Sequence, residues 1–359
     1  MNQNEINDKR LQADFKGITF SGFKKNAAKK ELLNNLQAGN IEPACYWSAE
    51  FICAGHIYDL WEFIFLFVSK NIHLGNPKLP IYIDLRYLLI DNIISGGYEN
   101  NEFKLRNNIK VRETMSEVIA VLCLSKKKNK YNPIKIKEEY YNITTISYRL
   151  KADSIKYAEP IFKKEDPKEL FIAINEFIYS INLANKDYNA AFFWLEWIIG
   201  YEDLCKKNGS KSYICARRNF PVDYKIQKDT IWMLWDCLFY ECKTNRNDMI
   251  YKILLSLQNL FCYKYKPGSK KRRKYILYFS ISLLTENLAN IQIINDDDKS
   301  TANSISKKVN IIYRQIKKNE QKPSTDYLFN NSITKGNLEK TIDRLDKLNS
   351  MTGIVPRNK

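Results

Sequence analysis

Two lysine-rich stretches hold the side chains best suited to binding a polyanion. The first, residues 126–137, contains Pro133, and the second, residues 264–274, contains Pro267. Like charges set side by side are costly unless water solvates them fully or phosphates face them. We therefore expect two surface loops that contact the phosphates of DNA or RNA without reading its sequence. In the alternative, both loops only make the surface more soluble.

The side chains expected to contact nucleic acid lie in these two stretches and in one turn before a helix, which holds Arg217 and Arg218. The full set is Lys126, Lys127, Lys128, Lys130, Lys135, Arg217, Arg218, Lys264, Lys266, Lys270, Lys271, Arg272, Arg273 and Lys274. Three tyrosines accompany them: Tyr131 in the first stretch, and Tyr263 and Tyr265 around the second. These rings could stack on bases or pack beneath the lysine stems.

The motifs of common catalytic and cofactor sites do not occur in the sequence. A P-loop, a Gly-x-Gly-x-x-Gly fingerprint, a Gly-x-Ser-x-Gly elbow and a His-Glu-x-x-His motif are all missing. We therefore expect a non-enzymatic protein without a cofactor. An enzyme whose catalytic residues come from distant helices stays an alternative.

A metal site is a weaker hypothesis than a structural role for the histidines. The chain has two histidines, His56 and His73, and His56 is followed at three-residue steps by Asp59 and Glu62. One helix face could present these three side chains to a metal ion. In the alternative, His56 and Asp59 cap and solvate the helix that follows, and this is what we expect.

The eight cysteines suit a chain kept in the reducing interior of a cell, where each acts as a small hydrophobic residue. Cys237 and Cys242 are five residues apart, so on a helix they would point about 140° apart, which does not favour zinc. Cys205 and Cys215 bracket a lysine-rich turn, and a redox-sensitive pair is an alternative there.

Composition predicts an all-α protein with a core of its own. The 359 residues are 45% hydrophobic but include only 12 glycines and 10 prolines, too few for a turn-rich β-sandwich or barrel. The net charge of +17 suggests a polyanionic partner, although codon bias in an AT-rich genome could supply much of the lysine. No apolar stretch follows the polar first ten residues, so we expect no secretory signal. The richest apolar run, residues 60–68, is shorter than the ~20 residues of a membrane span, so we expect a buried helix and no membrane partner.

The chain divides into two halves with the same order of features. An Ala-aromatic-Trp segment opens a helix at residues 44–47 and again at residues 191–194, and a Pro-bearing connection, further helices and a lysine-rich stretch follow each. We expect two helical lobes, residues 29–152 and 169–294, and a tandem duplication is one interpretation of them. A polar arm, residues 1–28, precedes the lobes, and residues 153–168 link them.

Helical periodicity and polarity predict what lies within the lobes and beyond them. Trp194, Trp197 and Ile198 recur at helical steps, as do Trp232 and Trp235, so we expect these side chains in the core. Residues 140–148 are β-branched and aromatic, which favours a short strand or an irregular connection. Residues 295–359 are polar, and we expect them to form a helical C-terminal appendage, with one helix near residues 337–351, that is mobile or waits for a protein partner.

Three segments resemble an uncharacterised all-helical family of large, mimivirus-like double-stranded DNA viruses. They are Asn-Ile-Glu-Pro-Ala-Cys-Tyr-Trp-Ser-Ala-Glu at residues 40–50, Ser-Lys-Asn-Ile-His-Leu-Gly-Asn-Pro-Lys-Leu-Pro at 69–80 and Phe-Pro-Val-Asp-Tyr-Lys-Ile-Gln-Lys-Asp at 220–229. The resemblance covers most of the chain to about residue 293. It implies a viral protein made in the host cytoplasm, near viral DNA replication, transcription or particle assembly.

Charge and resemblance together predict a basic helical protein that binds nucleic acid phosphates in viral replication, transcription or packaging. The alternative is a scaffold or minor structural protein of a virus particle that acts through protein contacts. We expect it in the host cytoplasm, at the viral factory, or in the virion. The nucleus is a further candidate location, because the Lys-Lys-Arg-Arg run at residues 270–273 matches a nuclear-import signal of low specificity.

Overall fold

The computed structural model of the protein describes residues 4–209, 214–244, 248–288 and 293–321. Helices make up the ordered elements of these ranges, and no strand occurs within them, which confirms the all-α fold. The segment expected to form a short strand instead contains two 3₁₀ turns, Glu138–Tyr141 and Ser147–Arg149. Without a partner strand, its backbone bonds are satisfied by local turns.

Five helices form the first group: α1 (Lys25–Ala38), α2 (Ile41–Cys53), α3 (Ile57–Phe67), α4 (Leu79–Ser95) and α5 (Ile109–Leu124). Gly39 ends α1 with a φ of 78°, a left-handed conformation that lets the chain reverse into α2. The Asn108 side chain caps α5 by accepting a hydrogen bond from the Val111 amide. Most of the apolar run at residues 60–68 is buried, as predicted.

The second group comprises α6 (Phe171–Ile181), α7 (Tyr188–Lys207), α8 (Ile231–Thr244), α9 (Asp248–Cys262) and α10 (Ser269–Thr285). The Asp187 carboxylate caps α7 by accepting from the Ala190 amide. Trp194 and Trp197 on α7, and Trp232 and Trp235 on α8, are at most 1% exposed. The prediction that these aromatic stripes are core is therefore confirmed.

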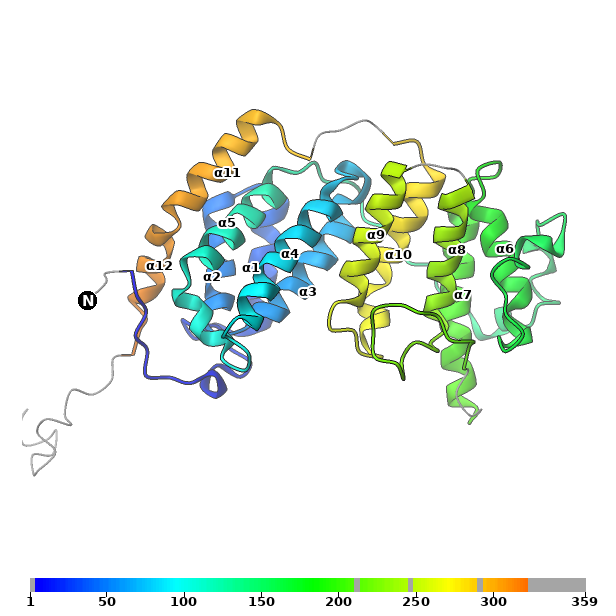
Figure 1. Cartoon of the computed structure of the whole chain (residues 1–359), viewed down its shortest axis with the longest axis horizontal. Coiled ribbons are helices and arrows are strands. Elements are labelled where there is room, and N and C mark those ends of the chain that lie inside the picture. The colour runs from blue at the N-terminus through cyan, green and yellow to red at the C-terminus, as the bar shows by residue number, and fades with distance from the viewer. Residues whose placement is uncertain (1–3, 210–213, 245–247, 289–292, 322–359) are drawn as a thin grey trace, which may run out of the picture.

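The two groups share one hydrophobic core. Figure 1 shows the helices side by side in an elongated row, in which α9 lies along α4 and α10 packs against α3. Buried apolar residues from both groups form one cluster that runs from Ala28 to Ala302. The expected boundaries of two lobes stay a prediction, and the structure does not confirm a tandem duplication.

The C-terminal helices α11 (Asp296–Lys308) and α12 (Asn310–Lys317) lie on the first group, α11 along α5 and α12 along α2. Val309, Tyr313 and Ile316 are at most 2% exposed, in a second core with residues of the N-terminal arm. Arg112 on α5 lies over the Tyr313 ring, 4.1 Å from its centroid. The expectation of a mobile or partner-seeking segment is therefore wrong for residues 296–321, because few apolar residues suffice when they share one face.

Two further expectations concern this end of the chain. The three aspartates at 296–298 form the first turn of α11, where the helix dipole favours them, and the Asn295 side chain caps that turn. The expected helix at residues 337–351 lies outside the described residues. Within those residues, every helix is too short or too polar to cross a bilayer.

The docking of α12 can be tested with two isoleucines of the same helix. Ile316 is fully buried, whereas Ile311 is 54% exposed. We expect Ile316→Ala to lower the free energy of unfolding by about 2–4 kcal/mol, because it removes buried methylene groups and leaves a cavity. Ile311→Ala should change it by less than about 0.5 kcal/mol. Urea denaturation of both variants measures the difference, and equal effects would contradict the docked position of α12.

Candidate nucleic-acid interface

The second basic stretch is a loop only in part. Lys264 and Lys266 precede α10, whereas residues 270–274 form its first turns, so the expectation of one basic loop is wrong there. A helix rotates about 100° per residue, which sends successive side chains to different surroundings. Lys270 and Arg273 are each 5% exposed, while Lys271 and Arg272 between them are exposed.

Lys270 is a structural cation. Its ammonium group donates to Glu202 Oε2 at 2.6 Å and to Asp229 Oδ1 at 2.9 Å, which ties α10 to α7 and to the segment before α8. Burial opposes the charge on Lys270, but the two carboxylates outweigh it and raise its pKa. The neighbouring turn repeats the arrangement, because Lys274 donates to Glu196 of α7 at 2.6 Å. Neither amine is positioned as the solvent-facing phosphate contact that the sequence predicts.

Arg273 joins the two groups of helices. Its guanidinium donates to the carbonyl oxygens of Phe261 and Tyr263, both at 2.7 Å, and it forms an ion pair with Glu62 of α3. Burial lowers the pKa of Arg273 to about 10, so the side chain stays charged at neutral pH. This residue therefore closes the turn between α9 and α10 and holds that turn against the first group.

Arg218 is likewise internal. It forms ion pairs with Asp166 at 2.8 Å and Asp236 at 2.7 Å, and its side chain is 1% exposed. These two carboxylates neutralise the charge of Arg218, so its side chain is not available to bind a phosphate. Its neighbour Arg217 is exposed and lies over the Tyr224 ring at 3.3 Å from the centroid.

The first basic stretch packs against the segment between α3 and α4. The Lys128 amide donates to the Asn71 carbonyl at 2.8 Å, and a Cβ atom at Gly75 would overlap the Lys126 carbonyl oxygen. Close passage of this backbone therefore requires glycine at position 75. Lys127 is half-buried and donates to the Cys123 carbonyl at the end of α5. The remaining predicted contacts of this stretch are exposed: Lys126, Lys128, Lys130 and Lys135.

The three tyrosines near the basic residues are buried in the core to different degrees. Tyr131 packs 4.4 Å from the His73 ring and donates to Ser282 near the end of α10, so it does not present a free face to bases. Tyr265 is 7% exposed, against Trp232 and Phe261. Tyr263 is only half-buried and lies beside Lys264 at the junction of the two groups.

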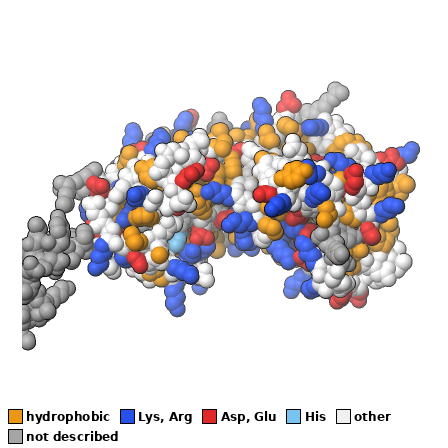
Figure 2. Space-filling view, turned by 60° about the horizontal axis from the view of Figure 1, so that its bottom comes forward, with side chains coloured by type: hydrophobic (Ala, Val, Ile, Leu, Met, Phe, Trp, Pro, Cys, Tyr) orange, Lys and Arg blue, Asp and Glu red, His pale blue; other side chains and the backbone are white. Residues whose placement is uncertain are grey.

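The two basic stretches meet successive turns of α10. The Tyr131 ring contacts Tyr278, and its hydroxyl donates to Ser282, whereas the second stretch ends at Lys274, about one turn before Tyr278. Figure 2 shows basic side chains spread over both groups on one face of the molecule, with acidic ones among them. A shared bivalent surface stays a prediction.

The exposed cations of the second stretch surround a cleft between α3 and α10. Two cavities of about 230 and 330 Å³ lie there, and Glu62, Arg272 and Arg273 line both of them. On α3 the lining residues Tyr58, Glu62 and Phe65 follow helical spacing, which places them on one face. On α10, Ser269, Arg272 and Arg273 do the same. We call this region the junction cleft.

Cations outnumber carboxylates in the junction cleft. The basic side chains that line its two cavities are Lys29, Lys70, Lys264, Lys266, Lys271, Arg272 and Arg273, seven in all, and the acidic ones are Asp59 and Glu62. Three of the seven have partners that reduce their effect: Arg273 pairs with Glu62, Lys271 with Asp203 at 2.9 Å, and Lys29 with Asp59 at 3.9 Å. The cleft still concentrates positive charge between low-dielectric walls, which favours an anionic ligand.

The residues considered for a metal site have other partners. His56 Nε2 lies within 3.0 Å of the Phe15 and Ile18 carbonyl oxygens, Asp59 pairs with Lys25 at 2.7 Å, and Glu62 pairs with Arg273. Among the described residues, no three His, Cys, Asp or Glu side chains are arranged to hold a metal ion. The eight cysteines are buried and none forms a disulfide.

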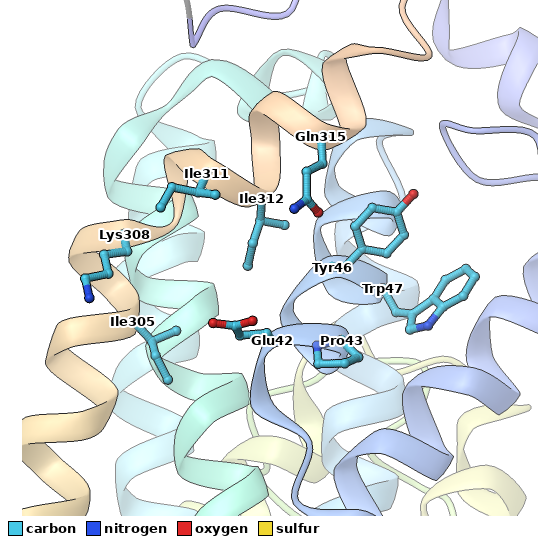
Figure 3. A pocket seen from close by; sticks show the side chains of 9 residues that line it. All are labelled: Glu42, Pro43, Tyr46, Trp47, Ile305, Lys308, Ile311, Ile312 and Gln315. Carbon is cyan, nitrogen blue, oxygen red and sulfur yellow. The ribbon is translucent and has the colours of Figure 1, made fainter.

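A separate groove of about 360 Å³ lies between α2 and the C-terminal helices (Figure 3). It is lined by Glu42, Pro43, Tyr46, Trp47, Ile305, Lys308, Ile311, Ile312 and Gln315. Its charges are few and of both signs, so it does not resemble a polyanion site. Nothing in the structure shows what would cover it.

Comparison with known proteins does not add an assignment. No family model, curated protein or solved structure matches the chain. The chemistry of the junction cleft is therefore the basis for a function. The sequence signal for this cleft was the acidic residue Glu62 inside an apolar helix, since a carboxylate there needs a cationic partner.

Replacing two adjacent lysines, one buried and one exposed, tests whether the buried charge stabilises the fold. We expect Lys270→Gln to lower the free energy of unfolding by about 3–5 kcal/mol, because Glu202 and Asp229 would lose a buried partner. Lys271→Gln should change it by less than about 0.5 kcal/mol, since its pair with Asp203 is exposed. Urea denaturation provides the measurement, and a neutral Lys270→Gln would contradict the structural role of this lysine.

The ion pair of Arg218 with Asp166 should make the free energy of unfolding depend on pH in the acidic range. Burial opposes ionisation of Asp166, but hydrogen bonds from Arg218 and backbone amides outweigh it and lower its pKa. Since the folded-state pKa lies below the unfolded value of about 3.9, the stabilisation is complete above that value and is lost as the pH falls through the folded pKa. We expect the unfolding free energy of Asp166→Asn to depend less steeply on pH below about 4 than that of the unsubstituted chain. Urea denaturation at a series of pH values tests this, and identical slopes would refute it.

Proposed function

We propose that this protein binds nucleic acid through phosphate contacts at the junction cleft. The observation that carries the proposal is the convergence of exposed Lys264, Lys266 and Arg272 at a cleft whose charged lining residues are mostly cationic. Phosphate contacts from lysine and arginine position a nucleic acid without reading its bases. Ser269 opens α10 at the same place, so the positive end of that helix adds to the field.

The contact set differs from the full predicted one. Arg218, Lys270 and Arg273 hold the fold together, and Arg273 also lines the cleft. The exposed side chains at the rim of the cleft meet the ligand. The exposed lysines of the first basic stretch extend the contact to neighbouring phosphates. As a non-enzymatic binding protein, the chain would serve viral replication, transcription or genome packaging, the processes that the viral resemblance implies.

A scaffold role through the C-terminal helices is not part of the proposal. The buried faces of α11 and α12 pack on α5 and α2 of the same chain. Those faces are therefore occupied. A protein partner could bind them only after α11 and α12 had detached from α5 and α2.

The salt dependence of binding tests the proposal. Binding of a fluorescein-labelled 12-nucleotide single strand is followed by polarisation over a series of salt concentrations. Each lost phosphate contact should flatten the slope of log affinity against log salt by about 0.7 on a single strand. We therefore expect the triple variant K264Q/K266Q/R272Q to flatten it by about 2.

The control variant removes the same number of positive charges at a site outside the junction cleft. K299Q/K307Q/K308Q changes three exposed lysines of α11, on the first group. This variant should keep the slope of the unsubstituted chain. Absence of binding at low salt, or equal slopes for the two triple variants, would overturn the proposal.

A further inference from the structure

The 230 Å³ cavity of the junction cleft combines aromatic walls with a cationic rim. Its aromatic lining comes from three segments: Tyr58, Trp61 and Phe65 of α3, Tyr87 of α4, and Tyr263 after α9. Its basic lining comes from Lys264, Lys266, Arg272 and Arg273. Aromatic rings beside lysine and arginine are the combination that proteins use to bind single-stranded nucleic acid, because rings stack on bases while cations meet phosphates.

The aromatic wall is held in a fixed position. Tyr87 and Tyr263 stack with their ring centroids 3.9 Å apart, and Trp61 meets Tyr87 edge-on at 5.3 Å. The Tyr263 hydroxyl donates to Asp84, which also accepts from Asn259 at 2.8 Å. Both groups of helices thus contribute to one preorganised wall, and preorganisation reduces the entropic cost of binding.

Lys264 occupies the place where a flat ring would stack. Its ammonium group lies over the half-buried Tyr58 ring, 3.6 Å from the centroid. Its backbone has a φ of 43°, in the left-handed region that is strained for a non-glycine residue. Strained residues of this kind concentrate at ligand sites. A base that stacks on Tyr58 would displace the ammonium group towards the adjoining phosphate.

Two buried donors in the cavity lining have no hydrogen-bond partner among the described residues. They are the indole Nε1 of Trp61 and the guanidinium Nε of Arg273, on side chains that are 1% and 5% exposed. Buried donors are nearly always paired in native proteins, and an unpaired one needs an explanation. Both nitrogen atoms have almost no solvent-accessible surface, so an acceptor on a ligand reaches them only after the lining side chains move.

We propose that this cavity receives one unpaired base, so that the ligand of the junction cleft is a single strand of nucleic acid. The inference rests on the proposed function and specifies its ligand. A cavity of 230 Å³ lies just below the range of about 300–1,000 Å³ of ordinary ligand pockets, which suits one ring system. Bases in a duplex are stacked and paired, so their faces do not enter such a site.

The path of the strand follows from the second cavity. That cavity, of about 330 Å³, adjoins the first across the Glu62–Arg273 pair and is lined by Lys29, Lys70 and Lys271. The base enters the aromatic cavity, its phosphate lies at Lys266 and Arg272, and the continuing backbone meets these three lysines.

Tyr58 is the residue with which to test the base site. It is half-buried, so its replacement leaves the core intact, and the charge of the cleft is unchanged. We expect Tyr58→Ala to weaken binding of the labelled 12-nucleotide single strand by about 5- to 140-fold, the value of one base–aromatic stack. Tyr58→Phe, which keeps the ring, should bind as the unsubstituted chain does. Tyr148→Ala, at a tyrosine 66% exposed outside the cleft, is the matched control and should not change binding.

A base-free probe separates stacking from charge. The same 12-unit sugar–phosphate strand with abasic sites throughout keeps the phosphates and lacks the bases. Tyr58→Ala should not weaken its binding, nor that of a 12-base-pair duplex, and the salt slope should stay as it is. Equal loss for the base-containing and abasic strands, or no loss for either, would overturn the inference.

Failure of this inference can be told from failure of the proposed function. If K264Q/K266Q/R272Q flattens the salt slope while Tyr58→Ala binds normally, phosphate binding stands and the base site is wrong. If the single strand does not bind at low salt, both are wrong. Circular dichroism and urea midpoints for each variant confirm that the fold is retained.

Discussion

The ion pair between Arg273 and Glu62 is the constraint on which the arrangement of the helices depends. Burial does not discharge a guanidinium near neutral pH, so its donors must be matched by acceptors. Arg273 meets this need with two carbonyl oxygens at the end of α9 and with a carboxylate on α3. The same set of contacts closes the α9–α10 turn, joins the two groups of helices and forms the wall between the two cavities of the junction cleft.

One short basic run thus has two roles. The helical rotation of α10 buries Lys270, Arg273 and in part Lys274 against acidic residues of α7 and α3, and it leaves Lys271 and Arg272 outside. The buried cations hold the helices in place through ion pairs. The exposed cations create the positive potential that attracts an anion. A substitution that removes the whole run would therefore confuse unfolding with lost binding. Charge at the rim of the cleft can be changed without that ambiguity.

Local patterns predicted the class of fold and much of the core. The helical spacing of Trp194 and Trp197, and of Trp232 and Trp235, sufficed to place them inside, because periodicity reports a buried face directly. The C-terminal helices were harder: apolar residues are few after position 296, but Val309, Tyr313 and Ile316 share one face. Tyr131 was expected to stack on bases or pack beneath lysine stems, and Arg218 to contact phosphate from a turn, but each has a partner far along the chain.

The sequence by itself determined the all-α architecture, the aromatic core and the positions of the two basic stretches, since each depends on residues within a few turns of one another. Only the tertiary structure decided which cations are structural and where the remaining ones converge. Arg273 and Glu62 are 211 residues apart, and Lys270 and Glu202 are 68 apart. No local pattern encodes such a pairing, because it depends on how whole helices pack. The junction cleft, and the stacking of Tyr87 on Tyr263 in its wall, arise from that packing alone.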